Sequence, residues 1–406
     1  NDMNCISRLF YVTLALLCLT LHLNASDWTM FRGPNHDGIS TETEWKKTWP
    51  ESGPKQLWET QVGIGFSSVS VADGRVFTLG NSDNKDTIVA FDAVSGKKVW
   101  SHTYDSKIGA KFYEGGPGST PTIDGKHVYV LSKWGDLFCL DAANGSVIWK
   151  RQLEKEEGVR LPDWGFNGSP LIHEKMLILN VGGGGMAVDK ANGKTIWFSN
   201  DEEAGYSTPL PFNHDGKSFI ALSSGSSFLG AEITTGKKTW EIQWPTRYGV
   251  NAADPIIAGD EIWIGSGYNK GHGLYQFNGS DTEVKWTNRE LRSQQNAPIL
   301  INDHLFGFDG DGGSRAALKC IERSSGKVVW EADEFKYGAV AAAGDQLIIM
   351  TAQGELIIAP ASPAGFNPTA RAKVLDGKCW TVPVIANGLV YLRNSKGHVI
   401  CLDLRP

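Results

Sequence analysis

Seven tryptophans at nearly constant spacing are the feature that most constrains the fold of this 406-residue chain. Successive members of the series are 42, 49, 48, 43, 46 and 44 residues apart. They are Trp58, Trp100, Trp149, Trp197, Trp240, Trp286 and Trp330. A period of roughly 45 residues is typical of folds in which one small unit recurs, so we expect a single repeated array. The two or three separate domains that the length alone would suggest are not expected.

Each unit is predicted to be two β-hairpins. In Ala90–Trp100 an apolar strand reaches Asp92, the turn at Ser95 and Gly96 supplies the positive φ that glycine tolerates, and a second strand ends on the tryptophan. The same pattern recurs in Cys139–Trp149, Ala187–Trp197, Ala231–Trp240 and Cys320–Trp330. A shorter hairpin precedes each unit, at Val71–Phe77, Ile123–Tyr129, Ile172–Leu177, Asn213–Phe219, Ile257–Trp263, Ile301–Phe306, Ala342–Leu347 and Ile385–Tyr391. Two hairpins make a four-stranded antiparallel blade, and the tryptophan is expected to cap the packing between neighbouring blades.

The two ends of the chain predict how the array closes. The eighth unit, Trp380–Asp403, supplies three strands and then the chain stops, whereas Lys55–Trp58 is a fourth strand with no preceding three. Pairing them removes the free sheet edges. The sequence therefore predicts an all-β, eight-bladed β-propeller of four-stranded antiparallel blades, closed by an N-terminal strand on the C-terminal strands. The seventh unit lacks the usual turn and tryptophan, and its last strand is predicted at Arg371–Leu375.

The first residues are expected to be a targeting segment. Arg8 is followed by a mostly apolar stretch, Leu9–Leu23, which is shorter than the ~20 residues of a membrane span, and Ala25 is a small residue suited to cleavage. We predict a signal peptide at 1–25, an N-terminal leader at 26–54 and the propeller at 55–406. The mature chain is expected to lack a transmembrane span and to be periplasmic or extracellular.

Charge and cysteine content narrow the partners and the chemistry. The formal charge is −6 and no long like-charge runs occur, which argues against nucleic-acid binding. After cleavage four cysteines remain, Cys139, Cys320, Cys379 and Cys401, with no C-x-x-C pair. They are expected to pack as small apolar residues in strands. A Cys379–Cys401 disulfide in an oxidising compartment is the alternative.

The unit A-x-D-x-x-[TSN]-G-K-x-x-W resembles the repeat of pyrroloquinoline quinone (PQQ) type propellers, a family that includes quinoprotein alcohol dehydrogenases and the BamB-like assembly proteins. The resemblance covers residues 55–404. The leader Trp28–Ser40 and the segment Gly377–Thr381 look like those of secreted propellers common in Planctomycetes. The resemblance implies the fold more firmly than an activity, because one fold hosts many functions.

A ligand or partner site is expected where the units differ. In such a blade the turns between the first and second strands and between the third and fourth strands share one face, here named the turn face. The blade-to-blade loops and the loops between the second and third strands share the opposite face, the loop face. Aromatic, amide and charged residues converge at the centre of the loop face, the default ligand site of a propeller. The candidates are Glu114, Trp134, Trp164, Asn167, Tyr248, Asn251, Lys378, Trp380 and Arg393. Simple packing of these residues at strand beginnings is the alternative.

Asp309 and Asp311 form the best metal-like run, because hard cations favour clustered carboxylates on a turning backbone. A solvated turn is the alternative interpretation.

No catalytic residue is assigned. A quinoprotein dehydrogenase of the resembled class would need an aromatic floor, Ca²⁺ ligands and a vicinal cysteine pair. Trp134, Trp164 and Trp380 could supply the floor and Asn167, Asn251 and Asp309 the ligands, but vicinal cysteines and long insertions are absent. We therefore expect a non-catalytic binding or assembly scaffold with an envelope protein partner or a small-molecule or sugar ligand. A PQQ- and Ca²⁺-dependent alcohol or sugar dehydrogenase is the alternative, followed by a lyase or hydrolase acting on a sugar polymer.

Overall fold

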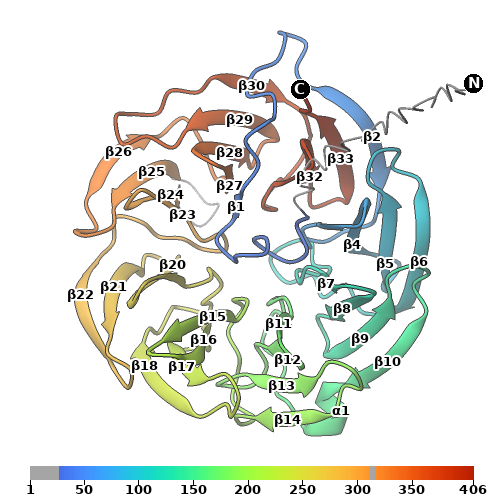
Figure 1. The fold of residues 1–406 in the computed structure, drawn as a ribbon, viewed down its shortest axis with the longest axis vertical. Helices are drawn as coiled ribbons and strands as arrows, with labels where there is room; N and C mark the ends of the chain where they lie inside the picture. The colour runs from blue at the N-terminus through green and yellow to red at the C-terminus, as the bar shows by residue number, and fades with distance from the viewer. Residues whose placement is uncertain (1–26, 311–315) are drawn as a thin grey trace, which may run out of the picture.

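The fold is an all-β propeller, shown by a computed structural model that describes residues 27–310 and 316–406. In the described residues, eight blades of four antiparallel strands each are arranged in a ring (Figure 1). This confirms the predicted eight-bladed propeller. The predicted signal peptide lies outside the described residues and stays a prediction.

Blades 1 to 4 follow one another along the chain. Blade 1 is β3 (Ser70–Ala72), β4 (Arg75–Ser82), β5 (Lys85–Asp92) and β6 (Lys98–Asp105). Blade 2 is β7 (Thr122–Asp124), β8 (His127–Leu131), β9 (Asp136–Asp141) and β10 (Val147–Gln152), and the short helix α1 (Leu153–Glu157) follows it. Blade 3 is β11 (Leu171–His173), β12 (Met176–Leu179), β13 (Met186–Asp189) and β14 (Thr195–Phe198). Blade 4 is β15 (Leu210–His214), β16 (Lys217–Ser223), β17 (Ser227–Glu232) and β18 (Lys238–Gln243).

Blades 5 to 8 complete the ring. Blade 5 is β19 (Ile256–Ala258), β20 (Glu261–Ser266), β21 (Gly271–Phe277) and β22 (Thr282–Asn288). Blade 6 is β23 (Ile299–Ile301), β24 (His304–Asp309), β25 (Ala317–Glu322) and β26 (Val328–Ala332). Blade 7 is β27 (Gly338–Ala343), β28 (Gln346–Thr351), β29 (Glu355–Pro360) and β30 (Ala370–Lys373). Blade 8 is β31 (Val384–Ala386), β32 (Leu389–Arg393) and β33 (His398–Asp403), with β2 (Lys55–Gln61) as its fourth strand.

The ring closes as the sequence predicts. β2 pairs antiparallel with β33, with Lys55 opposite Asp403 and Gln61 opposite His398. The outer strand of blade 7 differs slightly from its prediction. β30 begins at Ala370 and ends at Lys373, because the backbone N–H groups of Val374 and Leu375 turn away to bond the carbonyl of Gly354.

The tryptophans join neighbouring blades. Trp100 Nε1 donates to the carbonyl of Ala142 in blade 2 at 2.9 Å, and the ring lies on the turn glycine Gly145, where a Cβ atom would come within 2.4 Å of it. Five further tryptophans of the series donate to the next blade in the same way, at 2.8 to 3.1 Å. Within the described residues, seven blades carry a register shift beside the last strand. Such a bulge turns the strand. Here the residue before the tryptophan, such as Val99, is left exposed while the indole faces the next blade.

The leader contributes to the ring as well. β1 (Ile39–Ser40) pairs parallel with β27, so the sheet of blade 7 has five strands. Figure 1 shows the dark-blue leader crossing the middle of the ring. This strand was not predicted, because two residues carry no periodicity.

Candidate functional site

Four aromatic rings from different blade-to-blade loops form an arc on the loop face. Tyr337, Trp380, Phe66 and Tyr113 precede the first strands of blades 7, 8, 1 and 2. Their ring centroids follow one another at 5.7, 6.0 and 5.7 Å. We call this set the aromatic arc. Loops far apart in sequence thus bring four aromatic rings together on the loop face, and Trp380, one of the predicted site residues, is among them.

An ion pair spans the arc. Lys378 Nζ lies 2.9 Å from Glu114 Oε2 and 4.4 Å from the centroid of the Trp380 ring. Ser395 donates to the other carboxylate oxygen at 3.3 Å. Burial, the largest single influence, would raise the pKa of Glu114, but the hydrogen bonds from Lys378, the backbone and Ser395, together with the charge of Lys378, outweigh it and hold that pKa below its ordinary value. Glu114, Lys378 and Trp380 therefore form one cluster, in which the two charges already neutralise each other.

Lys133 contacts one ring of the aromatic arc, Tyr113, and was not among the predicted site residues. Its ammonium donates to Gly109 O at 3.2 Å and to Tyr113 Oη, and it lies 5.8 Å from the ring centroid of Trp134. Burial lowers the pKa of Lys133 to about 8, against the attraction of Asp86. Trp134 itself donates to Lys107 O at 2.6 Å and is partly exposed. A lysine in a second-to-third-strand loop carries no sequence signal of burial, so it was missed.

Trp164 and Asn167 lie in the loop that precedes blade 3. Lys111 Nζ sits 5.0 Å from the centroid of the Trp164 ring and 3.4 Å from Asp163. The Asn167 amide donates to the carbonyls of Trp164, at 3.3 Å, and Gly165, at 3.0 Å. The amide thus shapes its own loop, while the Trp164 ring is partly exposed.

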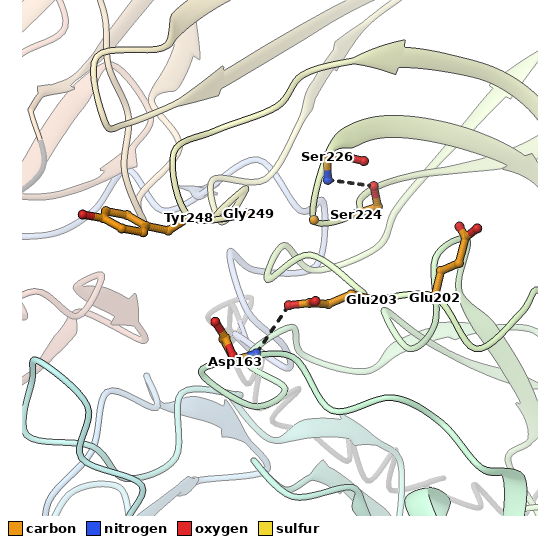
Figure 2. A pocket seen from close by; sticks show the side chains of 8 residues that line it. Asp163, Glu202, Glu203, Ser224, Ser226, Tyr248 and Gly249 are labelled. Atoms are coloured by element: carbon orange, nitrogen blue, oxygen red, sulfur yellow. Dashed lines mark hydrogen bonds between the residues drawn. The ribbon is translucent and has the colours of Figure 1, made fainter.

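Tyr248 borders an acidic cavity of about 490 Å³. Figure 2 shows the Glu203 carboxylate next to the backbone nitrogen of Asp163, while Glu202 and Tyr248 point away from that pair. Glu203 accepts from the Asp163 N–H at 3.4 Å and pairs with Arg160 at 3.2 Å. Tyr248 is 49% exposed, and its ring is covered on one side by Arg247 at 5.1 Å. Tyr248 therefore belongs to a different part of the loop face from the aromatic arc.

Two candidate ligand residues are buried between blades, so their assignment to the ligand site is corrected. Asn251 is fully buried: its amide donates to the carbonyls of Ser224 and Trp244, and its oxygen accepts from Ser266 Oγ at 2.7 Å. Arg393 is 1% exposed and donates to four oxygen atoms of blade 1 and its preceding loop. Both side chains hold neighbouring blades together and face no solvent.

The geometry of Asp309 does not favour the metal prediction. Its Oδ2 lies 2.6 Å from Arg292 Nη2 and 3.0 Å from Lys319 Nζ, and its Oδ1 accepts from Arg292 Nε at 2.8 Å. Burial would raise the pKa of Asp309, but these hydrogen bonds lower it. Its carboxylate charge is thus matched by two cations. Asp311 lies outside the described residues, and among those that are described no three His, Cys, Asp or Glu side chains are placed to hold a metal.

The residues that PQQ chemistry would use for calcium do not fit that ion. Asn167, Asn251 and Asp309 lie in the loops before blades 3 and 5 and at the end of β24, and each is held by the protein contacts described above. Since Ca²⁺ needs six to eight oxygen ligands at one point, this set cannot supply a common site.

The four cysteines are free and buried. Cys379 packs with Leu375 between blades 7 and 8, whereas Cys401 packs with Trp58 between blades 8 and 1. The two thiols lie in different inter-blade layers, so the packing interpretation applies and the disulfide alternative is wrong in this structure. Burial raises the pKa of both thiols to about 12.

No helix within 27–310 or 316–406 has the length and apolar character that a membrane crossing requires.

Comparison with known proteins decides the family. A family model described as outer membrane protein assembly factor BamB matches residues 84–332, more than half of the chain. The chain belongs to the BamB family. Among curated proteins, BamB of Yersinia pestis is 21% identical over 376 residues, which are 90% of this chain and 82% of that protein.

Solved structures place this BamB-family chain in the same fold. BamB from Moraxella catarrhalis superposes with a TM-score of 0.62 at 16% identity, over 86% of this chain and 97% of that one. Quinohemoprotein alcohol dehydrogenase from Comamonas testosteroni superposes with a TM-score of 0.67 at 13% identity, over 93% and 80%. At such low identity the two likenesses show the propeller fold and no more.

Proposed function

We propose that this BamB-family chain is a non-catalytic scaffold of the cell envelope that binds a protein partner through its loop face. The family match supports an assembly role, since the matching model and the Yersinia pestis relative are both described as outer membrane protein assembly factors. The same likeness supports an envelope localisation, and the predicted signal peptide is consistent with it.

The main support for the proposal is that several polar groups on the loop face are already paired with other side chains. Glu114 is paired with Lys378, Lys133 with Tyr113, and Asp309 with two cations. Groups committed to each other in this way are poor general acids, bases or metal ligands. Single aromatic side chains protrude on the same face: Phe112 is 96% exposed and Tyr248 is 49% exposed. Protruding aromatic residues are typical anchors of protein interfaces.

Site-specific photo-cross-linking in native envelopes tests the proposal. A photoreactive phenylalanine analogue replaces Phe112 or Tyr248 on the loop face, and Val94, which is 52% exposed at a turn between the third and fourth strands, serves as the turn-face control. We expect one discrete protein adduct from Phe112 and Tyr248 and none from Val94. Phe112→Ala should weaken the adduct formed at Tyr248 at least threefold. Equal adducts from both faces, or none at all, would contradict the proposal.

A quinoprotein oxidoreductase is the second candidate, because the Trp380 ring, with Lys378 Nζ 4.4 Å from its centroid, offers one aromatic surface with a cation beside it. Purified protein incubated with PQQ and Ca²⁺ should then gain quinone absorbance and reduce a dye with alcohols or sugars. Absence of both signals removes this candidate. The predicted sugar ligand remains a prediction, which a glycan array with Trp164→Ala and Trp380→Ala variants checks.

A further inference from the structure

The leader is held at the ring axis by backbone pairing at both of its ends. Trp28 exchanges two hydrogen bonds of 2.8 Å with Val71 in the middle of β3, and the carbonyl of Thr29 accepts from Ile123 N at 2.8 Å. At the other end, the carbonyls of Gly38 and Ser40 accept from β27 and its turn at 2.9 and 3.0 Å. The segment 28–40 thus spans from blades 1 and 2 to blade 7.

Arg32 anchors the middle of this segment. It is 3% exposed, and its guanidinium donates at 3.0 Å to each of the carbonyls of Ala297 and Pro298, which precede the first strand of blade 6. A third bond of 3.0 Å goes to the carbonyl of Asp37 in the leader. Asp254 of blade 5 attracts the same cation; burial raises the pKa of Asp254 to about 6, and Arg32 opposes that rise.

The surroundings of Arg32 show what the leader adds. In blades 1 to 5 the backbone N–H of one blade donates to a side-chain oxygen of the next, at 2.7 to 3.1 Å. This series runs Ser68, Thr120, Ser169, Thr208 and Asp254. Each of the last four directly precedes a proline, and in blade 6 the corresponding residue is Ala297, which has no side-chain oxygen. There Arg32 reaches the blade instead, through the carbonyl of Ala297.

The remaining side of the axis is apolar. Ala339, Ala341 and Val382 of blades 7 and 8 form a small buried cluster, and Phe31 of the leader packs against it. Adjacent leader residues, Phe31 and Arg32, therefore match an apolar and a polar part of the ring respectively.

We propose that the inner strands around the ring axis form a peptide-binding seat for a turn-rich segment with an aromatic residue followed by arginine, and that the leader is its ligand in cis. The seat binds through contacts along 28–40, together with the buried ring of Trp45 and the Lys46 N–H, which donates to Leu404 O at 2.6 Å, and it does not need the covalent link to β2. That link is peripheral: Glu51 and Ser52 are exposed. The inference does not rest on the proposed function.

The test separates leader from ring by a cut. A protease recognition sequence inserted after Ser52 in the full chain allows cleavage of the folded protein. We expect the leader fragment to co-elute with the ring in native gel filtration, with both pieces identified by mass spectrometry. Elution of the fragment apart from a ring that keeps its β-sheet circular dichroism spectrum would overturn the proposal.

Exchange of the fragment tests the role of Arg32 without altering the ring. A labelled synthetic peptide of residues 27–52 is added in excess to the cut wild-type protein, and its incorporation is measured at equilibrium. The peptide with Arg32→Ala should bind at least tenfold more weakly, and the peptide with Arg32→Lys should fall between, since an ammonium cannot bond both carbonyls in the forked geometry of a guanidinium. The peptide with Glu44→Ala, changed at an exposed leader position, should match the wild type. Equal binding of the Arg32 and Arg32→Ala peptides would also overturn the proposal.

Discussion

Arg393 is expected to be the most sensitive side chain at the point where the ring closes. From the end of β32 in blade 8 it donates to the carbonyls of Ser67 and Leu79 at 2.8 and 2.7 Å, to Thr78 Oγ1 at 3.1 Å and to the carbonyl of Gly63 at 3.1 Å. Burial lowers its pKa to about 9. The guanidinium therefore adds a buried polar link to the apolar packing that joins blades 8 and 1.

The magnitude follows from these contacts. Removing the side chain in Arg393→Ala leaves three carbonyls at the seam without their donor, each costing about 1–3 kcal/mol when buried. Relief from burying an unpaired charge offsets part of this loss. We expect a net decrease of about 3–5 kcal/mol in the free energy of unfolding. Arg393→Leu restores apolar contact and should recover about 1–2 kcal/mol.

Urea unfolding followed by tryptophan fluorescence measures the stability, and amide hydrogen exchange of β2 and β33 locates the loss. Exchange in those strands should accelerate more than in blade 4, on the far side of the ring. Arg405→Ala is the matched control, because Arg405 is a surface arginine paired with Asp403, and it should cost less than about 1 kcal/mol. If Arg393→Ala were no more destabilising than Arg405→Ala, the role of Arg393 in closing the ring would be refuted.

Three further predictions concern single side chains and turns. Burial lowers the pKa of Lys133 from 10.5 to about 8, so between these pH values the unfolded chain binds more protons than the folded chain. The free energy of unfolding of the wild type, relative to that of Lys133→Met, should therefore rise by up to about 3 kcal/mol between pH 7.5 and 10.5, as measured by urea unfolding. A difference that does not change with pH would contradict the burial of Lys133. Trp197→Phe removes a hydrogen bond between blades, whereas Trp240 Nε1 has no hydrogen-bond partner to lose. In thermal unfolding, Trp197→Phe should therefore lower the stability by about 1 kcal/mol more than Trp240→Phe. Equal losses of stability would show that the Trp197 hydrogen bond contributes nothing. Gly193→Ala should lower the free energy of unfolding by at least about 2 kcal/mol more than Gly216→Ala. Both glycines have φ +73°, but only at Gly193 would the added Cβ meet an indole ring, at 2.8 Å. Equal denaturation midpoints of the two variants would contradict this contact.

The sequence predicts the ring because each unit carries its own contact. The turn glycine and the tryptophan must meet across two blades, so their spacing encodes both the hairpin and the inter-blade joint. The same logic predicts the closing pair of β2 and β33, since an incomplete first unit and an incomplete last unit fit each other.

The candidate site is less predictable, because a loop position does not tell which way a side chain points. Glu114, Lys378 and Trp380 do meet at the centre of the loop face. Arg393, in contrast, ends β32 at the place where Leu79 and Leu131 stand in blades 1 and 2, both of them buried. Aligning the repeats on those leucines would have indicated burial. The leader gave no comparable signal, because its contacts with blades 1, 2, 6, 7 and 8 differ from one another and follow no repeat.

The pairing of β2 with β33 also sets an order in time. Lys55 finds its partner Asp403 almost 350 positions later, and at ribosomal rates of about 5–20 residues per second that interval is on the order of tens of seconds. Until then the ring can exist only as an open arc, with one unsatisfied strand at the beginning and a bare sheet edge at the advancing end. Both can pair with strands of other chains and so promote aggregation. The earliest of the blade strands to be made is thus among the last to find its partner.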